Sequence, residues 1–184
     1  MKYHSMLEPK NTILVIIDVQ GKLAQIMNDR EDLIKNLQVL ISGAKLLEIP
    51  IIWMEQLPDK LGPTISEIQE LLPDMNPIVK DVFSCARNEE FKTRLQELHV
   101  HNILLAGIEA HVCVYQTAMD LLDQDYGVHV AADAVSSRTD SNKQLGLERM
   151  LLEGVVQTSV EMVLFELQGI AKGERFRELA KLVK

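Results

Sequence analysis

The 184-residue chain has few cysteines, few aromatic side chains and no long hydrophobic run. Two cysteines are too few for a fold held together by disulfides, and aromatic residues make up only 4% of the sequence. The strongest early apolar run, residues 13–17, is far shorter than the roughly 20 residues that a membrane-spanning helix needs. Residues 1–11 lack the apolar stretch of a signal peptide, so we expect a cytoplasmic protein with two reduced thiols.

Positive charge is also scarce. Lys and Arg number 19 against 27 Asp and Glu, which gives a net charge of −8, and the basic residues form no cluster. Such a surface repels phosphate backbones and anionic lipids, which argues against nucleic acid or a membrane as a partner. A hydrophobic content of 47% is typical of a globular chain. The length suits one domain with a sizeable core, and we therefore expect a single domain over residues 1–184.

Short β-branched runs alternate with longer segments of helical period. The predicted strands are residues 13–17, 51–54, 78–80, 103–106, 128–131 and 155–157. The predicted helices are residues 32–47, 89–98, 112–122, 144–152, 160–167 and 174–183. The strand runs are almost continuously apolar, as expected when both faces of a sheet are covered. This alternation predicts a three-layer α/β/α fold of Rossmann type with a six-stranded parallel sheet.

Ligands of open parallel sheets bind beyond the carboxyl ends of the strands, where the strand order reverses. The candidate residues at that edge are Asp18, Glu55, Gln56, Lys80, residues 107–114, Asp133, Ser136, Ser137, Arg138, Thr158 and Ser159. In the common doubly wound order the first and fourth strands are neighbours, and this order would bring Asp18 beside Cys113.

Cys113 lies at the opening of a predicted helix, where free backbone N–H groups and the helix dipole favour a thiolate. An ordinary thiol with a pKa of about 8.5 is mostly protonated near neutral pH, so a base or a cation must activate it. Asp18 is the candidate base. Simpler interpretations are a buried inert cysteine for Cys113, a helix N-cap for Asp18 and a solvent-facing edge-strand lysine for Lys80.

These motifs resemble a known family. Asp18 after an apolar strand, Lys80 within residues 79–84, and the loop of residues 107–114 with Cys113 are similar to the Asp-Lys-Cys triad of isochorismatase-like cysteine hydrolases. The resemblance covers nearly the whole chain in order and spacing. Residues 54–56, 62–64, 83–84, 133–138 and 158–159 also resemble its isochorismatase-domain-containing branch.

The resemblance implies a hydrolase that cleaves a small amide or related acyl substrate through a thioester, without a cofactor. Asp18 would be the base, Cys113 the nucleophile, and Lys80 would keep Asp18 ionised and favour the thiolate. It further implies a cis peptide bond between Ile108 and Glu109, with an oxyanion hole made by the backbone N–H groups of Glu109 and Cys113. Family habit suggests a homo-oligomer, a dimer or larger.

Two departures narrow the choice within the superfamily. Nicotinamidases of this fold carry an Asp-x-His motif and a second histidine that hold a metal near the second strand. Here no histidine lies between His4 and His99, so we expect no such metal site. Isochorismatases that cleave a vinyl ether lack the nucleophilic cysteine, and the presence of Cys113 therefore favours amide or related acyl chemistry.

The remaining candidates have less specific signals. The candidate substrate contacts are Gln20, Glu55, Gln56, Phe83 and His111, although Glu55 and Gln56 could equally be polar loop residues. We expect His99 and His101 to be solvated turn residues, Cys85 to pack in the core or a pocket wall, and Ser159 to be an N-cap. An oligomeric binding or scaffold protein with an idle triad stays open, as does a redox-active thiol protein.

Overall fold

The computed structural model describes residues 6–184, so five residues of the predicted domain lie outside the described part. Six strands form one sheet in the order β3-β2-β1-β4-β5-β6, and every neighbouring pair is parallel. The strands are β1 (Thr12–Ile17), β2 (Ile51–Gln56), β3 (Ile78–Lys80), β4 (Asn102–Ile108), β5 (Gly127–Ser136) and β6 (Val156–Thr158). The predicted parallel sheet and its doubly wound order are confirmed.

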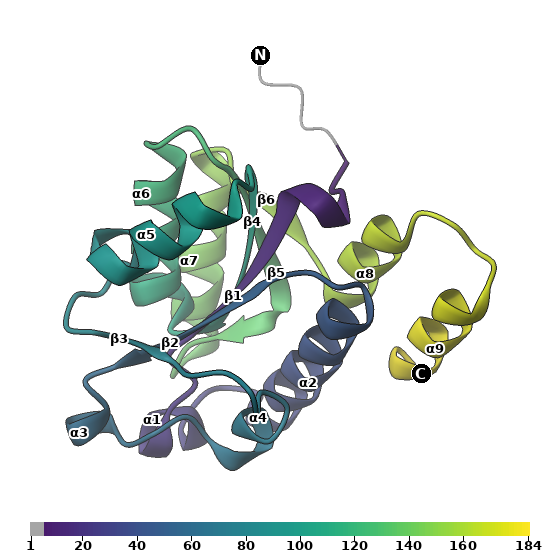
Figure 1. Ribbon diagram of the computed structural model, residues 1–184. Helices are drawn as coiled ribbons and strands as arrows, with labels where there is room; N and C mark the ends of the chain where they lie inside the picture. The colour runs from purple at the N-terminus through teal and green to yellow at the C-terminus, as the bar shows by residue number, and fades with distance from the viewer. Residues whose placement is uncertain (1–5) are drawn as a thin grey trace.

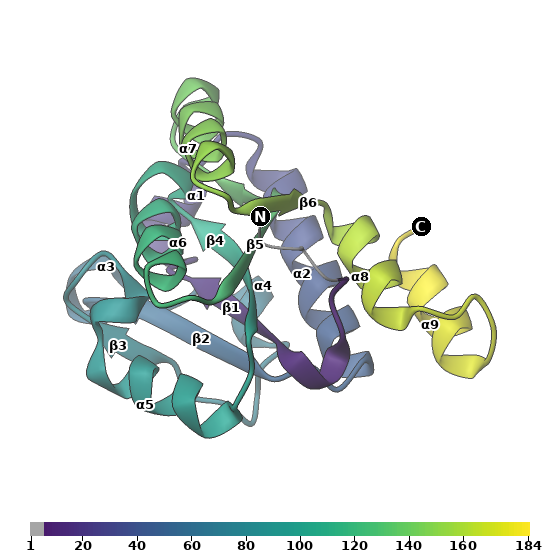
Figure 2. The ribbon, with the colours of Figure 1, turned by 90° about the horizontal axis from the view of Figure 1, so that it is seen from above.

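Helices cover both faces of this sheet (Figures 1 and 2). The α-helices are α1 (Gly21–Gln25), α2 (Arg30–Leu46), α3 (Pro58–Leu61), α4 (Ser66–Gln69), α5 (Glu89–Leu98), α6 (Tyr115–Leu122), α7 (Asp140–Leu152), α8 (Val160–Gln168) and α9 (Glu174–Leu182). Two 3-10 turns, η1 (Pro9–Asn11) and η2 (Cys85–Arg87), and one π-helical turn, η3 (Ala110–Val114), complete the set. Among residues 6–184, no helix combines the length and the hydrophobicity that a membrane span requires.

The apolar strands feed two hydrophobic clusters, one on each face. In β1, Leu14 and Ile16 join the cluster that α2 and α8 cover, whereas Ile13, Val15 and Ile17 join the cluster under α5, α6 and α7. Successive side chains of a strand point to opposite faces, so a strand buried on both sides must be apolar at every position. This explains why the runs of the sequence are continuous rather than alternating.

Side-chain caps fix several helix starts at this sheet. Asn88 accepts a hydrogen bond from the Phe91 N–H at the start of α5, and Ser159 accepts one from the Met162 N–H at the start of α8. The predicted N-cap role of Ser159 is therefore confirmed. Such caps satisfy backbone donors that have no partner within the helix.

The fifth strand is longer than predicted. It runs to Ser136, so Asp133 and Ser136 lie within β5 rather than beyond its end. The Asp133 carboxylate accepts from the Val160 N–H at 2.9 Å, at the start of α8. The prediction of a strand ending at residue 131 was wrong because polar side chains that serve neighbouring elements interrupt the apolar pattern.

Gly107 in β4 is the register partner of Ile17 in β1. Its φ is +112°, and a Cβ added there would lie 2.1 Å from the carbonyl oxygen of Ile17. Both the left-handed backbone and the close approach exclude a side chain. This contact sets the path of the chain from β4 toward Cys113.

We predict that Gly107→Ala destabilises the protein by about 3 kcal/mol or more, because it combines backbone strain with a clash against fixed backbone. Gly154→Ala is the matched control, since Gly154 has a φ of +102° but nothing within 4 Å of an added Cβ. Chemical denaturation of both variants measures the difference. Equal losses would show that the approach to Ile17 does not constrain the sheet.

Candidate active site

Three chemically distinct side chains converge at the carboxyl edge of the sheet. Asp18 directly follows β1, Lys80 is the last residue of β3, and Cys113 lies in η3 after β4. Because β1 lies between β2 and β4 in the sheet, the chain leaves β1 at the point where the strand order reverses. The candidate base, cation and nucleophile therefore lie at the carboxyl ends of three different strands and meet at one edge of the sheet.

Lys80 occupies the centre of this cluster. Its side chain is 0% exposed, and its ammonium donates to Asp18 Oδ2 at 2.6 Å, Gln56 Oε1 at 2.7 Å and the Val82 carbonyl at 3.1 Å. Three acceptors match the three N–H donors of an ammonium group. The Lys80 Nζ also lies 3.8 Å from the Sγ of Cys113. A solvent-facing role for Lys80 is therefore wrong, and it is Val79 of the same edge strand that is exposed.

Asp18 is a buried carboxylate with one oxygen engaged. Burial raises its pKa above the usual value of 3.8, while the charge and hydrogen bond of Lys80 oppose that rise. Its Oδ2 accepts from Lys80, whereas its Oδ1 has no hydrogen-bond partner among the described residues. The carboxylate therefore retains an acceptor position, and its raised pKa makes it a stronger base than an exposed aspartate.

Cys113 is only 8% exposed and lies beside both partners. Its thiol donates to Gln56 Oε1 at 3.6 Å. Burial raises the pKa of the thiol above its usual value, and the negative charge of Asp18 raises it further, while Lys80 lowers it. This direction is opposite to the one that the helix start and Lys80 alone predict, because burial and Asp18 outweigh them. The resting group is a thiol that needs a base.

The turn before Cys113 contains the cis peptide bond that the resemblance implies, between Ile108 and Glu109. The carbonyl of Glu109 accepts from the N–H groups of Val112 at 3.1 Å and Val114 at 3.2 Å. Cys113 lies within the resulting π-helical turn, and α6 begins two residues after it. The nucleophile candidate is therefore held by backbone hydrogen bonds at the start of a helix.

The loop after β5 holds the same turn through side chains. Glu109 Oε2 accepts from both the backbone N–H and the Nε of Arg138, each at 3.1 Å. His111 Nδ1 lies 2.9 Å from the hydroxyl of Ser137. His111 thus has a hydrogen-bond partner other than the thiol of Cys113. The Glu109 carboxylate contact was missed, although Arg138 lies in a motif that the resemblance includes.

Two of the five candidate substrate contacts, Gln20 and Glu55, have hydrogen-bond partners within the protein. The Gln20 amide donates to the carbonyls of Gln56 and Gly62 and accepts from the Gln56 N–H, which uses both of its polar atoms. Glu55 Oε1 accepts from the N–H and the hydroxyl of Thr64. Both side chains therefore fix loops at this edge of the sheet. Substrate contact by Gln20 and Glu55 stays a prediction.

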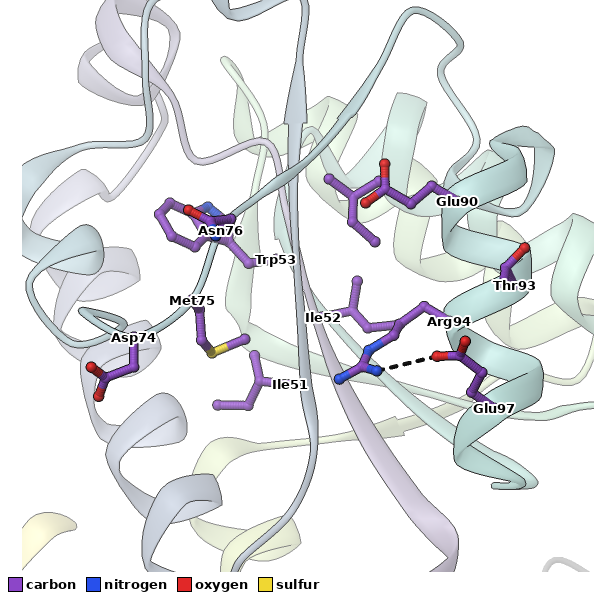
Figure 3. A pocket seen from close by; sticks show the side chains of 11 residues that line it. Ile51, Ile52, Trp53, Asp74, Met75, Asn76, Glu90, Thr93, Arg94 and Glu97 are labelled. Atoms are coloured by element: carbon purple, nitrogen blue, oxygen red, sulfur yellow. Dashed lines mark hydrogen bonds and ion pairs between the residues drawn. The ribbon is translucent and has the colours of Figure 1, made fainter.

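The other candidates remain near the edge. Gln56 is shared by Lys80 and Cys113, and Phe83, which follows Lys80 by three residues, is 52% exposed. A cavity of about 530 Å³ lies elsewhere, between the first residues of β2, Met75 and α5 (Figure 3). None of Asp18, Lys80 and Cys113 lines that cavity. The reactive groups are therefore separate from it.

Comparison with known proteins shows the family of this chain. The family model for the isochorismatase domain matches residues 12–162. The chain belongs to the isochorismatase family. Among curated relatives, a secreted isochorismatase effector, Isc1 of Phytophthora sojae, is 38% identical over 96% of this chain and 86% of its own. Isochorismatase domain-containing protein 2 of Homo sapiens is 33% identical over 96% and 84%.

Solved structures of the isochorismatase-like fold agree. One described as the MAR1 ribonuclease of Caenorhabditis elegans has a TM-score of 0.90 and 36% identity, covering 97% of this chain and 92% of its own. The YcaC gene product of Escherichia coli, described as an octameric hydrolase of unknown specificity, has a TM-score of 0.92. At 22% identity over 99% and 91% of the two chains, the latter comparison shows the fold alone.

Some isochorismatase-like enzymes hold a metal ion near the second strand. Among residues 6–184, no group of three or more His, Cys, Asp and Glu side chains could hold a metal ion. His99 ends α5 in the left-handed conformation, and His101 is an exposed residue just before β4.

Cys85 is fully buried, and burial raises the pKa of its thiol to about 12. The two histidines and Cys85 therefore agree with the turn and core interpretations.

We predict that Lys80→Met destabilises the protein by about 3 kcal/mol at neutral pH, because Asp18 is then buried without a counter-charge. The loss should shrink on acidification, since the Asp18 pKa is already raised and its protonation removes the buried charge. Because the wild type loses stability when buried Asp18 must ionise, the stability of Asp18→Asn should rise relative to wild type as the pH increases from about 4 to about 7. Urea denaturation across this range measures both, and parallel pH profiles would contradict the account.

We predict that Asp18→Asn lowers the pKa of the Cys113 thiol, because the carboxylate charge is one cause of its rise. Thiolate absorbance against pH, in a Cys85→Ser background, gives the pKa directly. The titration of Asp18→Asn should begin at lower pH than that of the parent, whereas Lys80→Met should move it the other way. Identical titration curves for Asp18→Asn and the parent would mean that Asp18 and Cys113 do not interact.

Proposed function

We propose that this member of the isochorismatase family is a metal-independent cysteine hydrolase that cleaves a small amide or related acyl compound. The observation that carries the proposal is the buried cluster in which Lys80 contacts Asp18 at 2.6 Å and lies 3.8 Å from the Sγ of Cys113. Family membership supports the hydrolase class. Beyond the hydrolase class, we propose a triad of Asp18, Lys80 and Cys113, a thioester intermediate and an amide substrate.

In the first step, Asp18 takes the thiol proton of Cys113 as the sulfur attacks the carbonyl carbon. A C–S bond forms, and the carbonyl electron pair moves to the oxygen. When the C–N bond breaks, protonated Asp18 gives its proton to the departing amine. The products of this half-reaction are a free amine and a thioester on Cys113.

In the second step, Asp18 removes a proton from water, which attacks the thioester carbon. The C–S bond breaks, the acid product leaves, and the proton returns to the sulfur of Cys113. One water molecule is consumed for each bond cleaved. The reaction needs no electron acceptor and no substrate other than water and the amide.

The Lys80 ammonium faces one negative charge in the site both before and after the proton transfer. At rest the site holds an ammonium, a carboxylate and a neutral thiol. After proton transfer it holds the same ammonium, a neutral carboxylic acid and a negative charge on sulfur or oxygen. Because the Lys80 Nζ contacts Asp18 and lies near Cys113, one buried cation faces the negative charge in both arrangements. A fixed cation of this kind requires little reorganisation during the reaction.

The developing oxyanion requires hydrogen-bond donors. We assign this role to the backbone N–H groups of Glu109 and Cys113, as the family resemblance implies. Removing one such donor from an enzyme typically lowers its rate by about 100-fold to 1,000-fold. The low exposure of Cys113 favours a small substrate. The candidate contacts for the substrate are Gln20, Glu55, Gln56, Phe83 and His111.

We do not propose for this chain the ribonuclease activity that the name of the Caenorhabditis elegans structure states. Nucleic-acid affinity depends on neutralising phosphates with Lys and Arg, and this chain has a net charge of −8. The proposal further places the protein in the cytoplasm, because both cysteines are free. It also includes one domain over residues 1–184 and a homo-oligomer, the latter by analogy with the octameric neighbour.

The test is turnover of a panel of small primary amides, followed by ammonia release. Wild type and Cys85→Ser should hydrolyse at least one member, whereas Cys113→Ala and Asp18→Asn should lose about 1,000-fold or more of that rate. Treatment with a chelator should leave the rate unchanged. Activity that survives Cys113→Ala would rule out the thioester mechanism, and activity that a chelator abolishes would contradict metal independence.

A further inference from the structure

The turn that carries Glu109 and Cys113 has an external anchor at its first residue. The Glu109 side chain is 10% exposed and accepts two hydrogen bonds from Arg138, one from the backbone N–H and one from Nε. The Arg138 side chain is 55% exposed. A buried carboxylate is therefore held by a guanidinium that reaches it from the surface.

The segment that provides Arg138 is itself fixed. Ser136 is the register partner of Ile108 in the sheet, and its hydroxyl donates to the Asn28 carbonyl at 2.6 Å. The Asn28 N–H donates in turn to the Ser137 carbonyl at 2.9 Å. The neighbouring hydroxyl of Ser137 meets His111. Arg138 thus extends from a loop tied to β4 and to the segment before α2.

Glu109 has separate roles for its backbone and its side chain. Its carbonyl accepts from Val112 and Val114 and so closes the turn around Cys113. Its N–H is one of the two donors that the proposed function assigns to the oxyanion. The carboxylate is then the group through which the rest of the protein orients this peptide unit.

We propose that Arg138 is a positioning residue, whose ion pair with Glu109 aims the Glu109 N–H at the developing oxyanion. The inference rests on the proposed function, because it concerns the same site. Replacing the Arg138 side chain, which is more than half exposed, leaves the Glu109 carboxylate its hydrogen bond from the backbone N–H of residue 138. This replacement should therefore affect the reaction more than the fold.

Two probes of Cys113 separate these effects. In acylation by p-nitrophenyl acetate, the sulfur bonds to a carbonyl carbon, an oxyanion forms and p-nitrophenolate leaves. In alkylation by iodoacetamide, the sulfur bonds to a methylene carbon and iodide leaves, with no oxyanion. Both reactions need the same thiol, but only the first needs the oxyanion hole. The ester is neutral, so its rate does not report attraction between Arg138 and a charged substrate.

In a Cys85→Ser background, Arg138→Met should slow acylation about tenfold or more and leave alkylation within about twofold. Arg138→Lys should recover part of the acylation rate, because it restores a cation. Glu109→Ala should slow acylation at least as much, and adding Arg138→Met to it should cause no further loss. Arg87→Met is the matched control, since Arg87 is also exposed and paired through Nε and Nη2 with Asp120. It should change neither rate.

Equal slowing of both reactions would overturn the inference, because the ion pair would then act on the thiol or on the whole fold. Unchanged acylation in Arg138→Met would also overturn it and leave an idle surface pair. A wild-type protein that is alkylated at Cys113 but never acylated is a different failure. That result would refute the proposed hydrolase and not the role of Arg138 alone.

Discussion

The buried contact between Lys80 and Asp18 is the interaction on which the rest of the site depends. It links the ends of β3 and β1, which are separated in the sheet by β2. Gln56, the register partner of Lys80 at the end of β2, completes the bridge by accepting from the same ammonium. A buried charge is costly unless its donors and acceptors are satisfied, so this bridge holds three strand ends in one arrangement. Cys113 meets that arrangement from the fourth strand.

The same contact explains why both titrating groups are held away from their usual behaviour. Burial raises the pKa of Asp18 and of Cys113, which favours a proton on each. A stronger base and a less acidic thiol therefore lie close together. In the proposed mechanism, attack on a substrate moves the proton from the thiol of Cys113 to Asp18. Lys80 limits the cost because it faces the negative charge before and after that transfer.

Much of the fold was predictable, because strands covered on both faces must be apolar throughout. The doubly wound order predicts that Asp18 lies near Cys113. Lys80 was not predictable from composition, since a lysine on an edge strand usually faces water and here it is Val79 that does so. The contacts of Gln20, Glu55 and Glu109 depend on loops whose paths are set by long-range packing. The cis peptide before Glu109 followed only from the resemblance to a family.

A thioester on Cys113 is the central intermediate of the proposed mechanism. The most direct measurement is peptide mapping after mixing the protein with p-nitrophenyl acetate and quenching with acid at increasing times. We predict an acetyl group on Cys113 that appears first and then decays as water releases acetate. An acetyl group found only on other side chains, or one that stays on Cys113 without decay, would contradict a hydrolase that works through this residue.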